Sequence, residues 1–300
     1  ARSLAATLAT GVTEARDAGG LTVPGVDALP PGPRPRLRLA GPMLGAEHAG
    51  RGAGHLARVV ADAVAAGSTW IKVVATGGLS APSETVLDPV FTRDELLEIG
   101  TAARSAGARV LAHAWGGSSI PWLVEAGVAS IEHGIHLTTA DADLLASAGI
   151  VLVPTVAIYR QTSEAETGVP VEIRDRAARA ADAHAIAVAV ARDAGVAIAL
   201  GTDAGTPAQH GANLAELAAL VDAGLTPIEA LTAATVVGAG LLAEPADLPS
   251  LGDLVLLDVD PLRTSEVTAE RVVAVVQGGR LVHQASPHPF FTASVVHSTH

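Results

Sequence analysis

Residues 109–133 read RVLAHAWGGSSIPWLVEAGVASIEH, and they are the most informative stretch for the fold class. Two short segments, Arg109–Ala114 and Ser130–His133, have the length expected of buried strands. Between them, Ser118–Ala126 has a helical pattern that ends at Gly127, where glycine suits the left-handed conformation of a helix C-terminal cap. This stretch therefore predicts a strand–helix–strand unit, in which a crossover helix joins two parallel strands.

The same alternation repeats along most of the chain. Further strands are predicted at Gly11–Arg16, Arg36–Ala40, Trp70–Ala75, Val151–Val156 and Val196–Gly201. Helical patterns cover Ala1–Ala9, Thr92–Ser105, Thr139–Ala148, Val171–Ala194 and a segment opening at Thr226. Seven such strands favour an α/β fold of the TIM-like (β/α)8 barrel type, with the remaining first strand expected before Ala1. An open doubly wound sheet is the rival, but the Gly-rich dinucleotide turn typical of it is absent from the sequence.

The pattern changes beyond about Ala243, which predicts three regions. Residues 1–243 form the barrel, residues 244–285 contribute strands of a small β subdomain, and residues 286–300 form a tail without a clear pattern. The subdomain strands are expected at Asp253–Asp258, Val272–Gln277 and Arg280–His283, with Gly278-Gly279 as a hairpin turn between the last two.

Composition excludes several classes of function. The 300 residues carry a net charge of -12 and no basic patch, which argues against a nucleic-acid partner. There is no cysteine, so disulfides, thiolate metal sites and a cysteine nucleophile are excluded. The most apolar stretch, 181–200, is interrupted by charged residues, and no membrane span or signal peptide is predicted. We therefore expect a cytoplasmic protein, with homo-oligomerisation left open.

Four predicted strands carry an unusual residue at the end where a barrel places its active site. These residues are Lys72, His113, His133 and Asp203. Each has an ordinary alternative: a lysine that reaches solvent, a histidine satisfied in the core, or an aspartate in a turn. Four coincidences at equivalent barrel positions favour a metal site instead, because neutral imidazole and carboxylate are common zinc ligands. Lys72 fits such a site if carbon dioxide carboxylates it, since it then behaves as a bridging carboxylate.

Tyr159 is the only tyrosine and follows a predicted strand end. Its hydroxyl is a candidate hydrogen-bond donor to a substrate, and a packing aromatic with a solvated tip is the alternative.

With these residues in place, the chain resembles the amidohydrolase superfamily. The resemblance is closest to the branch of metal-dependent dipeptidases and amidases that includes Xaa-Pro dipeptidase-like enzymes, with imidazolonepropionase as a more distant relative. The matching segments run in family order: Gly11–Gly20, Ile71–Gly78, Ala112-His113-Ala114, Ser130–Gly134, Val153-Pro154-Thr155, Leu200–Pro207 and Gly252–Asp258.

The resemblance implies a metal-dependent hydrolase that cleaves a C–N bond in an amide or dipeptide-like small molecule. Carboxylated Lys72 would bridge two divalent metals, and zinc is the expected ion. His113 and His133 would bind the second metal. Asp203 would bind the first metal, orient the hydroxide and pass a proton to the leaving group, while Tyr159 would contact the substrate.

Two departures from the family pattern leave alternatives open. The His-x-His motif of the first barrel strand is absent, which predicts an N-terminally truncated chain with one or two metals. Trp115 stands where relatives often have a second histidine. A cyclic amidohydrolase or a deaminase on the same site is therefore an alternative, and a degenerate, non-catalytic barrel is another.

Overall fold

A computed structural model describes residues 1–166, 168–242 and 252–285. The helices are α1 (Arg2–Ala9), α2 (Val23–Asp27), α3 (His55–Ala65), α4 (Arg93–Ser105), α5 (Ser119–Ala126), α6 (Thr139–Ala148), α7 (Val156–Ser163), α8 (Val171–Asp193), α9 (Ala215–Asp222), α10 (Pro227–Thr232) and α11 (Gly238–Leu242). The strands are β1 (Glu14–Arg16), β2 (Arg36–Arg38), β3 (Met43–Leu44), β4 (Trp70–Val74), β5 (Arg109–Ala114), β6 (Ser130–His133), β7 (Val151–Val153), β8 (Leu254–Leu257), β9 (Val272–Gln277) and β10 (Arg280–Gln284).

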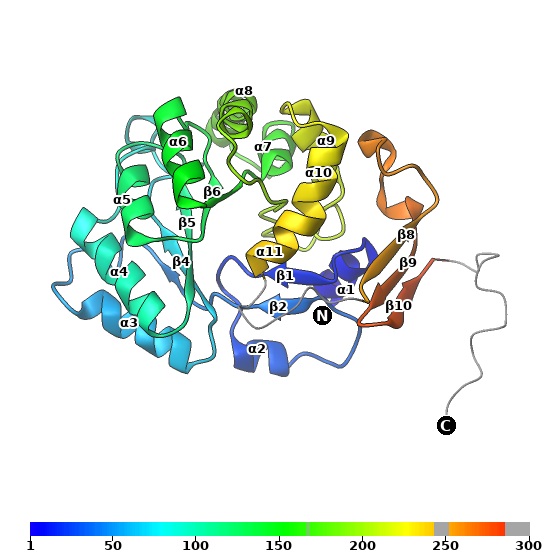
Figure 1. Ribbon diagram of the computed structural model, residues 1–300, viewed down its shortest axis with the longest axis horizontal. Helices are drawn as coiled ribbons and strands as arrows, with labels where there is room; N and C mark the ends of the chain where they lie inside the picture. The colour runs from blue at the N-terminus through cyan, green and yellow to red at the C-terminus, as the bar shows by residue number, and fades with distance from the viewer. Residues whose placement is uncertain (167, 243–251, 286–300) are drawn as a thin grey trace.

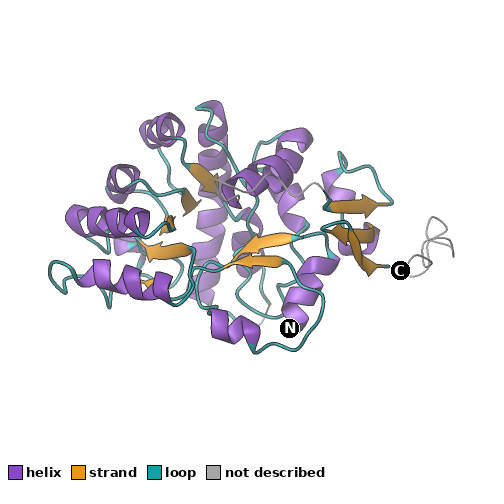
Figure 2. Cartoon of the chain, turned by 60° about the horizontal axis from the view of Figure 1, so that its bottom comes forward, coloured by secondary structure: helices purple, strands orange, loops and turns teal. Residues whose placement is uncertain are grey.

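The parallel strands follow one another in chain order, as a barrel requires. β1 pairs with β2, and β3, β4, β5, β6 and β7 form one sheet in that order. The carbonyl of Leu39, just after β2, accepts hydrogen bonds from the N–H groups of Thr69 and Trp70, which brings the end of β2 beside β4. Helices surround the strands in Figures 1 and 2. The predicted TIM-like barrel is thus confirmed.

Most predicted boundaries lie within two residues of the observed ones. Thr92 caps α4 and Thr226 caps α10, each in a reciprocal capping box with the glutamate three residues on. The strand predicted at 151–156 is shorter, because the chain turns at Thr155 and α7 starts at Val156. The strand predicted at 196–201 pairs with β7 only through the bridge between Leu152 and Ile198.

Strand alternation divides the apolar residues between two layers. Ile71, Val110 and Ile131 point outward and pack beneath the surrounding helices in the main core cluster. Trp70 and Leu111 point inward, into a smaller cluster that fills the barrel. Lys72 and His113 lie two residues beyond Trp70 and Leu111 on the same strands. They therefore share the inward face, nearer the carboxyl ends of the strands.

Charged side chains lie beside this apolar cluster at the floor of the barrel. The guanidinium groups of Arg16 and Arg109 each lie 4.7 Å from the centre of the Trp70 ring. Arg16 forms a buried ion pair with Glu132 at 2.8 Å and donates to Ser130 Oγ at 2.9 Å. This layer lies beneath the inward-facing lysine and histidines.

The C-terminal strands form a separate antiparallel sheet, with β9 between β8 and β10. Its hairpin turn contains Gly278 and Gly279, both at positive φ, as a two-residue turn prefers. Leu8 of α1 packs with Val272 and Val275 of this sheet.

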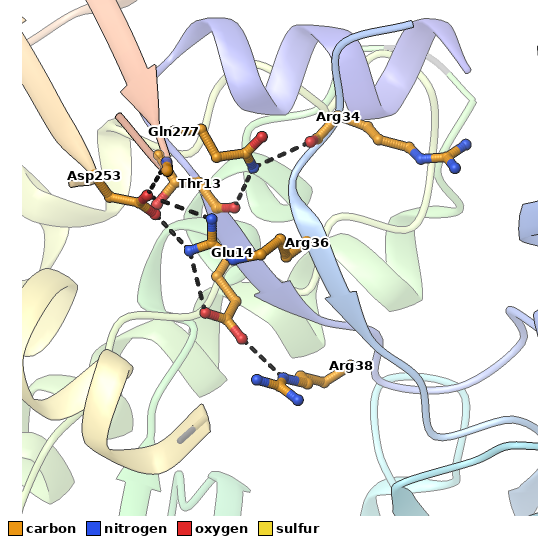
Figure 3. A network of polar contacts seen from close by, with 8 residues as sticks. Thr13, Glu14, Arg34, Arg36, Arg38, Asp253 and Gln277 are labelled. Carbon is orange, nitrogen blue, oxygen red and sulfur yellow. Dashed lines mark hydrogen bonds and ion pairs between the residues drawn. The ribbon is translucent and has the colours of Figure 1, made fainter. Parts of the chain in front are cut away.

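A polar network completes the junction between this sheet and the barrel (Figure 3). Gln277 Nε2 donates to the carbonyl of Thr13 at 2.7 Å, and Arg36 contacts Asp253 at 2.5 Å and Glu14 at 3.5 Å. The Glu14 carboxylate also accepts from Arg38 at 2.8 Å. These contacts join the first two barrel strands to the C-terminal sheet.

The predicted three-region division stays a prediction. Its boundary at residue 243 and its tail at 286–300 lie outside the described residues. No helix in the described part of the chain is both long enough and apolar enough to cross a membrane.

Candidate functional site

Lys72 and His113 come from the neighbouring strands β4 and β5. The Lys72 side chain is almost wholly buried, with 6 % of the residue exposed. Burial is the main influence that lowers its pKa, and Glu132, Asp203 and Asp17 oppose that shift as nearby negative charges. Burial, and then the nearby Lys72, also lower the pKa of His113 to about 4, so its imidazole is neutral at pH 7.

His133 reaches the same place by a backbone turn. Alternation along β6 directs Glu132 inward, and the next residue of a regular strand would point outward. His133 instead has a φ of 76° at the strand end. The rings of His113 and His133 consequently lie edge to face, with their centroids 4.6 Å apart.

Three left-handed residues mark three successive strand ends. His133, Thr155 and Asp203, with φ of 76°, 57° and 50°, are the only described non-glycine residues at positive φ. His133 is the last residue of β6, Thr155 follows β7, and Asp203 follows the segment that contains Ile198. Such a conformation costs about 1–3 kcal/mol, and residues held in it concentrate at functional sites.

Hydrogen bonds engage one nitrogen of each histidine ring. His113 Nε2 donates to the carbonyl of Gly77 at 2.8 Å, and His133 Nδ1 lies 2.8 Å from Thr155 Oγ1. His184 Nε2 donates to the backbone carbonyl of His133 at 2.9 Å. Contacts of this kind orient imidazoles that bind metals, and they leave Nδ1 of His113 and Nε2 of His133 for a ligand.

Asp203 shares the electrostatic environment of Lys72. Burial is the main cause of its raised pKa, and the charge of Lys72 opposes the shift. A small pocket beside Asp203 is lined by residues that include Thr202, Ala204 and Gln161. The structure therefore groups all four predicted residues at one end of the barrel.

Tyr159 lies in α7 rather than in an open loop. Only 3 % of it is exposed, and its hydroxyl accepts a hydrogen bond from Trp115 Nε1 at 3.1 Å. Its ring lies 5.8 Å from that of His133 and 5.4 Å from that of His184. Trp115, the departure from the family pattern, thus holds the tyrosine hydroxyl against the site.

Several residues around the site carried no sequence signal that singled them out. His184 is fully buried on α8, because α8 packs closely against α7. Asp17 directly follows β1, where the period-two pattern gives no reason to expect a charge near Lys72. Glu216 on α9 is also fully buried.

The donor chemistry fits a divalent metal under one condition. Among the described residues, no three His, Cys, Asp or Glu side chains converge closely enough to hold a metal ion. Burial also lowers the pKa of His133 well below its ordinary value, so His113 and His133 are both neutral imidazoles. They are suitable ligands, each oriented by a hydrogen bond on its other nitrogen. Lys72 lies beside them and repels a cation as an ammonium, whereas its carboxylated form would supply the missing carboxylate.

Known proteins resemble this chain in sequence over most of its length. It is 32% identical over 262 residues to ochratoxinase from Aspergillus niger, a match that covers 83% of this chain and 52% of that protein. It is 32% identical over 231 residues to imidazolonepropionase from Salinispora arenicola, covering 73% of this chain and 52% of the relative. The chain thus spans about half the length of these curated relatives.

Solved structures agree with these matches. The crystal structure of A. niger ochratoxinase superposes with a TM-score of 0.83 at 26% identity, over 96% of this chain and 76% of that one. A Xaa-Pro dipeptidase with bound methionine in its active site superposes with a TM-score of 0.80 at 25% identity, over 95% and 78%. The model of the amidohydrolase family, whose members generally use divalent metals, matches residues 1–282. The chain therefore belongs to the amidohydrolase family.

Proposed function

We propose that this protein is a metal-dependent hydrolase that cleaves the C–N bond of an amide or dipeptide-like small molecule. The observation that carries the proposal is the pair of neutral imidazoles, His113 and His133, 4.6 Å apart beside the buried Lys72. Family membership and the similarity to ochratoxinase and a Xaa-Pro dipeptidase support the choice of bond.

Lys72, His113, His133 and Asp203 would hold the metal, for which zinc is the expected ion. Burial favours the neutral amine of Lys72, which is the form that reacts with carbon dioxide to give a carbamate. Lys72 is the only lysine in the sequence, so a carbamate on a lysine side chain has one possible location. Bound divalent metal supplies a Lewis acid that polarises the scissile carbonyl and makes water a stronger nucleophile.

Asp203 is proposed to move the proton. Its pKa lies above the ordinary value because of burial, which suits a group that takes a proton from water and delivers it to the leaving amine. Its left-handed backbone at the strand end keeps the carboxyl near Lys72. Tyr159 is proposed to line the substrate site through its ring, with its hydroxyl held by Trp115.

The first experiment measures metal per chain by elemental mass spectrometry after growth with zinc and bicarbonate. In parallel, 13C-labelled bicarbonate should produce a carbamate resonance in the wild-type protein that Lys72→Ala lacks. Arg58→Ala, on the exposed side of α3, is the matched control and should keep both metal and resonance.

A panel of dipeptides and N-acyl amino acids then tests the reaction. We expect hydrolysis by the wild type and by Arg58→Ala, and loss of hydrolysis in Lys72→Ala. Full metal occupancy with unchanged turnover in Lys72→Ala would overturn the proposal. The absence of both metal and turnover, even in a chain extended at the N-terminus, would favour a non-catalytic barrel. Cytoplasmic location and homo-oligomerisation stay predictions.

A further inference from the structure

The start of helix α7 is capped by a side chain from a different helix. Glu216 of α9 is fully buried, and its two carboxyl oxygens accept the backbone N–H groups of Val156 at 2.7 Å and Ala157 at 2.8 Å. These are the first two residues of α7, whose N–H groups have no partner within their own helix. Glu216 therefore satisfies two donors that a residue of α7 would usually satisfy.

The usual capping residue serves another purpose here. Thr155 precedes α7, and threonine commonly accepts an N–H from the helix that it precedes. Here it makes no such bond; its hydroxyl lies 2.8 Å from His133 Nδ1 instead. Its backbone is left-handed, with a φ of 57°, an unusual conformation for a β-branched residue. Capping by Glu216 thus leaves the Thr155 hydroxyl available to the histidine.

Glu216 is costly to keep in this place. Burial raises its pKa to about 8, and the two N–H groups and the charge of Arg160 only partly oppose that shift. An apolar residue would avoid this cost but would leave two buried N–H groups without partners. The acid is therefore explained by the contacts that it makes with the α7 start.

We propose that Glu216 is a positioning residue for the active site, acting through the start of α7 and Thr155 to set the orientation of the His133 imidazole. The inference rests on the proposed function for the role of His133 as a metal ligand. Glu216 would then contribute to metal affinity from α9, although its hydrogen bonds go to the start of α7 and not to the predicted ligands.

The test uses the full chain and two variants on the same path. Glu216→Gln keeps the side-chain size but replaces one acceptor oxygen by an NH2 donor, which faces one of the two N–H groups. The variants are compared at pH 9, above the pKa of about 8, where the wild-type Glu216 is a carboxylate. Thr155→Val removes the hydroxyl that contacts His133. Glu229→Gln is the matched control, because it also alters a helix N-terminal cap, at α10, away from the site. Circular dichroism and thermal unfolding establish that each variant is folded.

Two readouts follow on the folded variants. Zinc affinity, measured by competition with a chelator, should fall about 10-fold in Glu216→Gln and at least as much in Thr155→Val. Losses of this size are typical when a residue that orients a metal ligand is replaced. The double variant should bind zinc no more weakly than Thr155→Val alone, because both changes act on one path. The 15N shifts of the His133 ring in metal-free protein should move in Glu216→Gln but not in Glu229→Gln.

The outcomes separate this inference from the proposed function. Wild-type protein that binds no zinc would overturn the proposed function, while the His133 ring shifts in metal-free protein would still test the path from Glu216. Unchanged ring shifts and unchanged zinc affinity in a folded Glu216→Gln would overturn the inference and leave the proposed function standing. Additive losses in the double variant would also contradict a shared path.

Discussion

Replacing Arg16 by methionine would leave a negative charge buried in the barrel floor. The Arg16 and Glu132 side chains are 8% and 6% exposed, and the guanidinium donates to both carboxylate oxygens at 2.8 Å. Methionine fills part of the same volume and can still pack on Trp70, but it offers no donor. The variant therefore isolates the loss of charge compensation from the loss of packing.

The expected cost follows from that burial. Removing one partner of a buried ion pair typically costs about 3–5 kcal/mol, because the remaining charge has no compensation. Glu132 keeps a hydrogen bond from Ser130 at 2.6 Å, which favours the lower end, about 3 kcal/mol. For a chain of 300 residues, with an unfolding entropy of about 2.1 cal/mol/K per residue, that corresponds to a fall in Tm of roughly 5 °C.

Urea denaturation of wild type, Arg16→Met and Arg16→Met/Glu132→Gln provides the assay. We expect the double variant to recover a large part of the loss, because it removes the uncompensated charge. Arg93→Met serves as the control, since Arg93 pairs with Glu125 on the exposed surface and should matter little. A loss below about 1 kcal/mol in Arg16→Met, or a double variant no more stable than the single, would show that Glu132 does not depend on Arg16 for charge compensation.

Three further predictions concern Glu216, Gly100 and Tyr159. Burial raises the pKa of Glu216 from 4.5 to about 8, so between pH 5 and pH 8 the folded chain keeps a proton that the unfolded chain has lost. The contribution of Glu216 to the free energy of unfolding should therefore fall as pH rises from 5 to 8. Urea midpoints at both pH values should show a flatter dependence in Glu216→Gln, and equal slopes would contradict the shift. In Gly100→Ala the added Cβ would lie 2.1 Å from the carbonyl oxygen of Ala126, which would force α4 and α5 apart. The variant should lose about 1–3 kcal/mol of stability in thermal unfolding. Unchanged stability would show that the two helices move apart without cost. Tyr159→Phe leaves the buried Trp115 Nε1 without its acceptor and should cost about 1–3 kcal/mol. If the Tyr159 hydroxyl has no direct role in binding, KM for a hydrolysed amide should stay unchanged, whereas a large rise in KM would assign the hydroxyl to substrate.

Much of the barrel was predictable because its signals are local. The capping boxes at Thr92 and Thr226 depend on residues three positions apart, and the Gly278-Gly279 turn depends on two neighbours. The strand containing Lys72 was recognisable from its apolar period. The strand predicted at 151–156 was too long because the chain takes a left-handed turn at Thr155. A β-branched residue rarely adopts that conformation, so the sequence did not indicate the turn.

The candidate site was predictable only as a set of residue types at strand ends. The alternation of side chains along β4 and β5 places Lys72 and His113 on the same face of the sheet, so their proximity follows from the strand pattern. His133 departs from this alternation, since its position depends on a positive φ and on contacts from Thr155 and His184. The burial of His184 was not predictable from the sequence, because it depends on how α7 and α8 pack.

The order of strands and helices, the caps and the residues available for chemistry were predictable, since these depend on periodicity and on neighbours within a turn or two. Which of those residues meet depends on how distant elements pack. Glu216 caps a helix 60 residues away, and Arg16 pairs with Glu132 from 116 residues away. Such contacts depend on packing between distant elements. A buried charge is tolerated only when its partner is buried beside it, and that pairing forms only in the folded chain.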